Sequence, residues 1–147
     1  MDEKNIPQED IRLFGYNIFS KIGVPRNIGV TVVNGLVDTS LRGVDSHGVR
    51  LIPHYVRAVI LGRINKNPRF SFKKTSISTG LLDAGHGFGI AAGILAMQKA
   101  IQLAKKNGLS AVAVKNSTHF GAAAIYSLLA AKNNMIGVSF THTASLV

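Results

Sequence analysis

The sequence contains no cysteine and no long apolar run. The absence of cysteine excludes a disulfide framework and any cysteine-ligated zinc or iron–sulfur site, and it fits a reducing cytoplasm. The longest uncharged stretches, such as Ala84–Gln98, are interrupted by glycine and histidine. They are shorter than the ~20 apolar residues that a membrane-spanning helix needs. The N-terminal Met1–Lys4 is followed by no apolar segment of the kind found in signal peptides. We therefore expect a cytoplasmic protein with no membrane span and no metal centre.

Acidic residues are also scarce, and their distribution limits the possible chemistry. The sequence has only seven Asp and Glu residues but 17 Lys and Arg residues, which gives a formal net charge of +10. No Asp or Glu occurs between Ala84 and Val147. A carboxylate base or a carboxylate-rich metal site therefore cannot be built from this half alone. Its candidates for proton chemistry are His86, His119, His142 and the lysines.

A basic stretch separates the two halves of the chain. Such a stretch can contact the phosphates of nucleic acid. Only two phenylalanines interleave with the basic side chains, however, and charge runs are commonly solvated surface. We keep a nucleic-acid-binding module without catalysis as the alternative function, to be tested by salt-dependent retention on DNA or RNA, and regard it as the weaker interpretation. The basic residues are Arg57, Arg63, Lys66, Arg69, Lys73 and Lys74.

Apolar spacing divides the chain into a helical front and an alternating back. Three helices are predicted over residues 9–21, 28–41 and 49–60, and Pro53 either opens or kinks the third of them. Residues 65–74 are predicted to form a polar linker. The back half is predicted to run strand–helix–strand–helix–strand, over residues 76–83, 90–104, 111–115, 122–132 and 135–141.

Gly87–Ala92 has the spacing G-x-G-x-x-A and lies between a predicted strand and a predicted helix. This is the context in which a dinucleotide pyrophosphate binds a Rossmann fold through Gly87, Gly89 and Ala92. The carboxylate expected at the end of the next strand is missing, and Lys115 occupies that place. Two interpretations stay open, a phosphate-binding turn and a tight turn that needs glycine for steric reasons.

Two further motifs gather polar side chains next to predicted helices. Asp45–Arg50 brings together a hydroxyl, an imidazole and a guanidinium, which suits either a helix cap or an anion-binding corner for a substrate carboxylate. Asn116–Gly121 is a polar loop between a strand and a helix, and it contains His119. A histidine at a helix N-terminus has its neutral form favoured by the helix dipole. Such an imidazole can give or take a proton near physiological pH.

These two motifs belong to a longer pattern that resembles the malate/L-lactate dehydrogenase family, which does not use the ordinary Rossmann fold. The family includes ureidoglycolate and sulfolactate dehydrogenases and piperideine-2-carboxylate reductase. The resemblance covers nearly the whole chain in one order, and its most specific parts are the Ser-His-Gly and His-Phe-Gly stretches. The matching segments are Leu41–Val49, Pro53–Val56, Asp83–Gly89, a helix with Met97, Ala100 and Ile101, Asn116–Gly121, Tyr126, Ala130–Ala131, Ile136–Val138 and Thr141–Thr143.

The resemblance implies an α+β chain with the L-sulfolactate-dehydrogenase-like fold. A helical region with the Ser-His-Gly motif would occupy residues 1–74. The first part of a mostly antiparallel NAD(P)-binding sheet with helices would occupy residues 75–147. This fold argues against a Rossmann role for Gly87–Ala92. The resemblance also implies a homodimer whose active sites lie near the subunit interface.

The resemblance further implies hydride transfer between a 2-hydroxy acid, such as malate or lactate, and its 2-keto acid, with NAD or NADP as the cofactor. His119 matches the catalytic acid/base, while Ser46 and His47 match the substrate-binding pair. Thr143 matches a position near the cofactor, and the adjacent His142 stands where the family commonly has asparagine.

Two departures from the family pattern affect these expectations. The substrate-binding arginine is Arg50, one residue before the family position, which is Leu51 here. On a helix, one residue changes the direction of a side chain by about 100°. The chain is also much shorter than family members and stops after an apolar predicted strand, which would leave an exposed sheet edge. We therefore expect a truncated family member with little activity alone.

Overall fold

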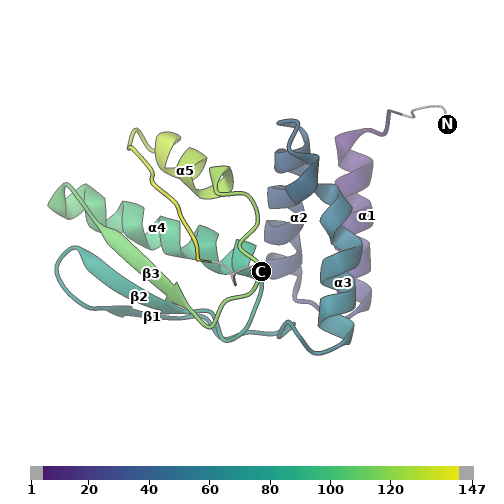
Figure 1. Cartoon of the computed structure of the whole chain (residues 1–147), viewed down its shortest axis with the longest axis horizontal. Helices are drawn as coiled ribbons and strands as arrows, with labels where there is room; N and C mark the ends of the chain where they lie inside the picture. The colour runs from purple at the N-terminus through teal and green to yellow at the C-terminus, as the bar shows by residue number, and fades with distance from the viewer. Residues whose placement is uncertain (1–4, 143–147) are drawn as a thin grey trace.

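The computed structural model describes residues 5–142, and its first half consists of three helices packed around an apolar core (Figure 1). Helices α1 (Gln8–Lys21) and α2 (Arg26–Ser40) each follow a proline, whose fixed φ suits the residue before a helix. A turn of 3-10 helix over residues 49–51 then leads into α3 (Ile52–Ile60), which has Pro53 in its first turn. The three predicted helices are therefore confirmed, and Pro53 opens the third rather than kinking it.

The core of this first half is completed by the start of a fourth helix. Side chains from α1, α2 and α3 pack with Phe88, Ile90 and Ala91 in one buried cluster. Phe19 of α1 meets Phe88 edge to face, with ring centroids 5.5 Å apart. This contact fixes the beginning of the second half of the chain against the helical half.

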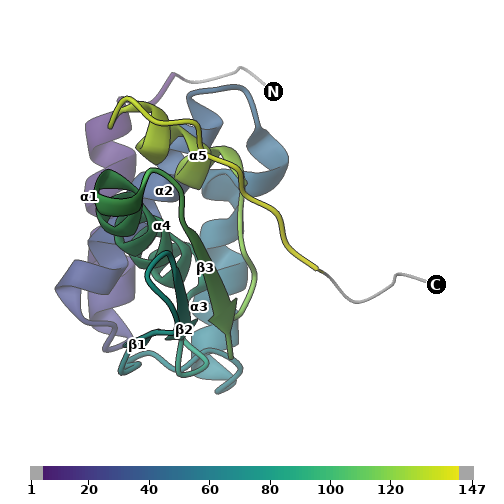
Figure 2. The same ribbon diagram turned by 90° about the vertical axis from the view of Figure 1, so that its left-hand side faces the viewer.

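The second half forms a three-stranded mixed sheet with helices on one face (Figures 1 and 2). Strand β1 (Ser71–Lys74) pairs antiparallel with β2 (Thr79–Asp83), which pairs in parallel with β3 (Ala111–Lys115). The parallel pair requires a crossover connection, which is α4 (Gly89–Asn107). Helix α4 covers one face of the sheet, and α5 (Ala124–Ala131) packs on α4.

Strand β1 corrects the expectation of a polar linker over residues 65–74. Its sequence, Ser-Phe-Lys-Lys, has a single apolar side chain. Phe72 lies opposite Leu82 and packs with it under α4, whereas the two lysines are exposed. The segment is an edge strand that depends on its pairing with β2 rather than on its own pattern.

The strand predicted over residues 135–141 is wrong for the part of the chain that the structure describes. Residues 135–142 form no ladder with another strand. The segment runs along α5 instead (Figure 2), where a side chain at Gly137 would come within 2.6 Å of Ala130. The alternating apolar residues Ile136, Val138 and Phe140 are 97%, 70% and 85% exposed. An extended segment becomes a strand only when it pairs with a neighbouring strand, and no strand within residues 5–142 pairs with this segment.

Within residues 5–142, no helix is both long and apolar enough to cross a membrane.

Candidate active site

The loop after β3 is fixed to the start of α4 by the side chain of Thr118. The Thr118 hydroxyl donates to the carbonyl oxygen of Gly87 at 2.9 Å and accepts the Gly89 backbone N–H at 3.2 Å. A side chain at Gly89 would collide with the carbonyl oxygens of Thr118 and His119. Glycine is therefore required at position 89 because the two backbones touch. This contact places His119 beside the helical half of the molecule.

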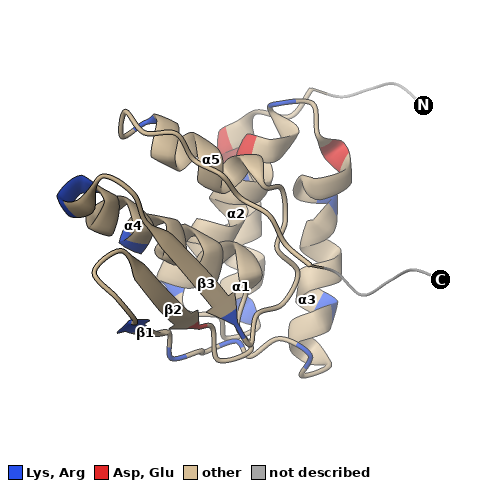
Figure 3. Ribbon diagram, turned by 60° about the vertical axis from the view of Figure 1, so that its left-hand side comes forward, with Lys and Arg blue, Asp and Glu red and all other residues tan. Residues whose placement is uncertain are grey.

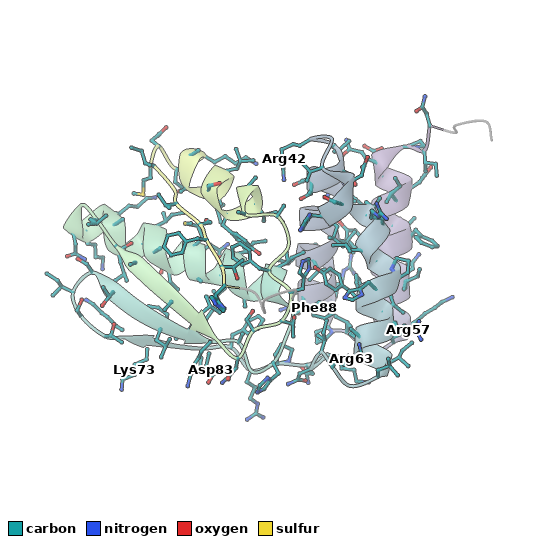
Figure 4. The ribbon with its side chains drawn as sticks, in the orientation of Figure 1. Arg42, Arg57, Arg63, Lys73, Asp83 and Phe88 are labelled. Carbon is teal, nitrogen blue, oxygen red and sulfur yellow. The ribbon has the colours of Figure 1, made fainter. Side chains whose placement is uncertain are left out.

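The side chain of His119 is held by Tyr55, which comes from α3. The Tyr55 hydroxyl lies 2.7 Å from Nδ1 of His119, although the two residues are 64 positions apart. Tyr55 is only 1% exposed and meets Phe88 edge to face, with centroids 6.0 Å apart. Phe88 lies at the seam between the helical half and the sheet half (Figure 4). A buried phenol ring therefore orients an imidazole that is partly open to solvent.

The Ser-His-Gly motif supplies the other side of the site. His47 lies in a short 3-10 turn and stacks on His119, with ring centroids 5.6 Å apart and planes 27° apart. The Ser46 hydroxyl hydrogen-bonds Nδ1 of His47 at 2.9 Å. The structure thus brings together three of the predicted site residues, Ser46, His47 and His119, from two motifs far apart in the sequence.

The surroundings of His119 disfavour its charged form. Burial lowers the pKa of His119 below its usual 6.5, and the nearby positive charges of His47 and then His54 lower it further. The predicted direction is therefore confirmed, but the predicted cause is not. Helix α5 begins only at Ala124, so His119 is not in its first turn. A neutral imidazole at neutral pH is available to accept a proton.

The remaining predicted site residues are not part of this cluster. The side chain of Arg50 is exposed in the turn over residues 49–51 and makes no hydrogen bond or ion pair with any residue among 5–142. Leu51, at the family's arginine position, is half-buried against the helical core. His142 is exposed, and Thr143 lies outside the described residues.

The described residues do not form a dinucleotide site at Gly87–Ala92. A side chain at Gly87 would collide with Pro68, and Gly89 is closed off by the loop that carries His119. The first backbone N–H of α4 is already bonded to Thr118, so it is not free for a phosphate. These glycines permit close packing, and the Rossmann interpretation of this turn is wrong.

The basic stretch lies away from the site. All six of its side chains are exposed, and Figure 3 shows the basic residues spread along the edge that runs from α3 to β1. Arg57 and Arg63 are near the end of α3, while Lys73 lies on β1 (Figure 4). This basic edge takes no part in the contacts around His119.

Tyr55 is the residue that sequence analysis missed, although a signal for it was present. It falls three residues after Ile52 and four before Val59, which places it on the buried face of α3. A tyrosine on a buried face needs a hydrogen-bond partner for its hydroxyl. The pattern could therefore have predicted that Tyr55 reaches a polar group, but not that the group is His119.

Comparison with known proteins adds independent information. A family model described as malate/L-lactate dehydrogenase matches residues 6–147. The malate dehydrogenase of Pyrococcus abyssi is 39% identical over 142 residues, which cover 97% of this chain and 39% of the relative. The ureidoglycolate dehydrogenase (NAD(+)) of Escherichia coli is 28% identical over 142 residues, which cover 97% of this chain and 41% of the relative.

The solved structures agree with the fold. The sulfolactate dehydrogenase of Methanocaldococcus jannaschii superimposes with a TM-score of 0.84 at 35% identity, covering 88% of this chain and 38% of that one. The expected α+β fold of the L-sulfolactate-dehydrogenase type is therefore confirmed. The chain spans about two-fifths of the length of the curated relatives it matches.

Proposed function

Because this chain belongs to the malate/L-lactate dehydrogenase family, we propose that it contributes to the oxidation of a 2-hydroxy acid, of malate or lactate type, and to the reverse reduction of the 2-keto acid. The observation that carries the proposal is the contact between His119 and the Ser-His-Gly motif, with the rings of His47 and His119 5.6 Å apart. Two motifs from different halves of the chain meet at this point, and each offers groups suited to a small polar substrate.

His119 would act as the acid/base at the substrate oxygen. In oxidation, a neutral imidazole takes the hydroxyl proton, and in reduction the imidazolium returns a proton to the carbonyl oxygen. The lowered pKa of His119 favours the neutral form. The oxidation rate should therefore be sustained at neutral pH, whereas the reduction rate should fall as the pH rises through this pKa. Ser46 and His47 would bind the substrate next to His119, and Arg50 remains the candidate for binding the substrate carboxylate.

We propose NAD or NADP as the cofactor, supported by the name of the ureidoglycolate dehydrogenase (NAD(+)) relative. His142 and Thr143 stay the predicted cofactor-side residues. The turn at Gly87–Ala92 offers no free Gly89 backbone N–H to a phosphate, because that N–H already donates to the Thr118 hydroxyl. The chain spans about two-fifths of its relatives, and we propose that it has little turnover alone. The homodimer, the cytoplasmic location and the division of the chain into a helical region (1–74) and a cofactor-binding region (75–147) stay predictions.

The test combines binding with turnover. Oxamate, an unreactive analogue of a 2-keto acid, is titrated into the 15N-histidine-labelled chain and followed by NMR. We expect the imidazole signals of His47 and His119 to shift, while that of His86, an exposed residue outside the cluster, stays constant. Shifts spread equally over all histidines, or none at His47 and His119, would contradict the proposed substrate site.

Turnover is measured as NAD(P)H oxidation with oxaloacetate, pyruvate or sulfopyruvate. His119→Ala should remove whatever activity the chain shows, because it removes the proposed acid/base imidazole. The matched control is His86→Asn, since asparagine tolerates the positive φ of 59° at that position. Activity that persists in His119→Ala would refute the acid/base assignment.

A further inference from the structure

The hydrogen bond between Tyr55 and His119 distinguishes the two nitrogens of the imidazole. Nδ1 is occupied at 2.7 Å by the Tyr55 hydroxyl. No hydrogen bond to Nε2 is recorded within residues 5–142. We propose that Tyr55 is a positioning residue, which holds Nδ1 of His119 so that the proton is exchanged with the substrate at Nε2. This inference rests on the proposed acid/base role of His119.

The packing around Tyr55 makes it a rigid support. The residue is 1% exposed on α3 and meets Phe88 edge to face, and Phe88 in turn meets Phe19 of α1 in the same manner. Its hydroxyl makes no other hydrogen bond with the residues that the structure describes. A buried hydroxyl without a partner is unfavourable. The phenol therefore has both a fixed position and a reason to keep its bond to His119.

A hydroxyl partner suits both protonation states of the ring, because it can donate or accept a hydrogen bond. When Nδ1 lacks a proton, the Tyr55 O–H donates to it and the proton of the neutral ring lies on Nε2. When Nδ1 carries a proton, as in the imidazolium, the N–H donates to the Tyr55 oxygen. Tyr55 can thus orient the ring throughout the proton transfer without adding a charge to the site.

The proton balance of the reaction follows from this arrangement. In reduction, the Nε2–H bond of the imidazolium would break and an O–H bond would form on the former carbonyl oxygen, with the hydride to carbon coming from the reduced nicotinamide that the proposed reaction requires. The ring is left neutral with its proton on Nδ1, which donates to Tyr55. In oxidation, the hydroxyl proton returns to Nε2.

The direct test is the tautomer of His119 in the 147-residue chain. Two-bond 1H–15N correlation spectra of 15N-histidine distinguish a protonated Nε2 from a protonated Nδ1. At a pH where the ring is neutral, we expect His119 to be almost entirely the Nδ1–H tautomer, because its Nδ1–H donates to the Tyr55 oxygen and leaves Nε2 free to accept the substrate proton. In Tyr55→Phe, which keeps the ring packing, the tautomer mixture should approach that of exposed His86. A wild-type His119 whose mixture already equals that of His86 would overturn the proposal.

Kinetics separate this inference from the function on which it depends. Tyr55→Phe should lower kcat about tenfold, equivalent to about 1.4 kcal/mol, and leave KM within about twofold, because orientation rather than binding is lost. Tyr16→Phe removes a hydroxyl that bonds Asn34 at 2.5 Å, away from the site, and should leave kcat unchanged. If His119→Ala loses turnover and Tyr55→Phe does not, the positioning role is wrong and the acid/base role stands. If neither variant changes turnover, the acid/base role is wrong, and the tautomer measurement still decides whether Tyr55 holds Nδ1.

Discussion

The helical half and the sheet half of the molecule are buried to very different degrees. In the helical half, Phe19, Val32, Val33 and Leu36 are completely buried within a large cluster. The core beneath the sheet contains only Leu82 and three alanines as buried residues. Strand β3 has no buried residue, and the segment after α5 exposes three large apolar side chains. The difference indicates that the helical half supplies most of the hydrophobic stability of this chain.

The candidate site lies where these two unequal halves meet. Tyr55 and His47 come from the helical half, whereas His119 comes from the loop after β3. The well-packed half thus provides the fixed groups and the more open half provides the proton-transferring one. The geometry of His119 depends on Thr118, which attaches its loop to the start of α4.

The largest expected change in unfolding free energy comes from creating a cavity in each of the two cores, and it tests this comparison directly. Leu36→Ala should cost about 4 kcal/mol of unfolding free energy, because the tightly packed helical core cannot collapse around the void. Leu82→Ala should cost about 2 kcal/mol, because the open sheet half can relax more easily. Both side chains are 0% exposed, so burial alone predicts equal losses. The measurement is urea-induced unfolding followed by circular dichroism.

Leu41→Ala is the matched control, since Leu41 is 62% exposed at the end of α2. Its effect should stay within about 0.5 kcal/mol. A loss for Leu82→Ala that equals or exceeds the loss for Leu36→Ala would contradict the idea that stability resides mainly in the helical half.

The same contrast explains how much of the fold could be predicted from the sequence. The helices were predictable because apolar residues at helical spacing are a local signal, and α1, α2 and α4 follow it closely. Strand β1 was not predictable from the sequence, because Ser71–Lys74 has no alternating pattern and depends on pairing with its neighbour β2. Residues 135–141 have the alternating pattern but no neighbouring strand among the described residues. Pairing between strands is a property of the whole fold, which a local pattern does not contain.

The candidate site, like the fold, could be predicted from the sequence only in part. Ser46, His47 and His119 were predictable because the residues stand in specific motifs within the resemblance. The contact between them, and the hydrogen bond from Tyr55 across 64 positions, depend on how Tyr55 of α3 packs against Phe88, the residue before α4. The lowered pKa of His119 was predicted with the wrong cause, since burial and neighbouring imidazoles rather than a helix dipole produce it.

A smaller effect concerns the polar contacts that tie the ends of β2 and β3 together. Asp83 accepts the Gly85 backbone N–H at 2.9 Å, the Asn116 amide at 3.0 Å and the Lys115 ammonium at 3.2 Å. The hydrogen bonds from Gly85, Asn116 and Lys115, in that order, lower the pKa of Asp83 to about 2. The unfolded chain binds a proton near 3.8. The contribution to stability is therefore complete above pH 3.8 and is lost as the pH falls through about 2.

Asp83→Asn should therefore lower stability at neutral pH and flatten the pH dependence of the unfolding free energy between pH 4 and 2. Lys115→Met removes only one of the three donors, and we expect a weaker flattening. Urea unfolding at a series of pH values measures both variants. A profile for Asp83→Asn as steep as that of the wild type would show that this carboxylate does not stabilise the sheet half.

The smallest effect on stability should come from the exposed apolar row of Ile136, Val138 and Phe140. Ile136 is 97% exposed, so Ile136→Thr should change the unfolding free energy by less than about 0.5 kcal/mol. The same substitution should reduce self-association, because contiguous exposed apolar side chains promote contact between molecules. Leu109→Thr is the control, since Leu109 is 78% exposed in the turn between α4 and β3, away from this row. Sedimentation velocity over a concentration series should show less association for Ile136→Thr than for Leu109→Thr. A loss of stability above about 1 kcal/mol would mean that Ile136 is covered in solution, and the sheet half would then be less open than the comparison with the helical half requires.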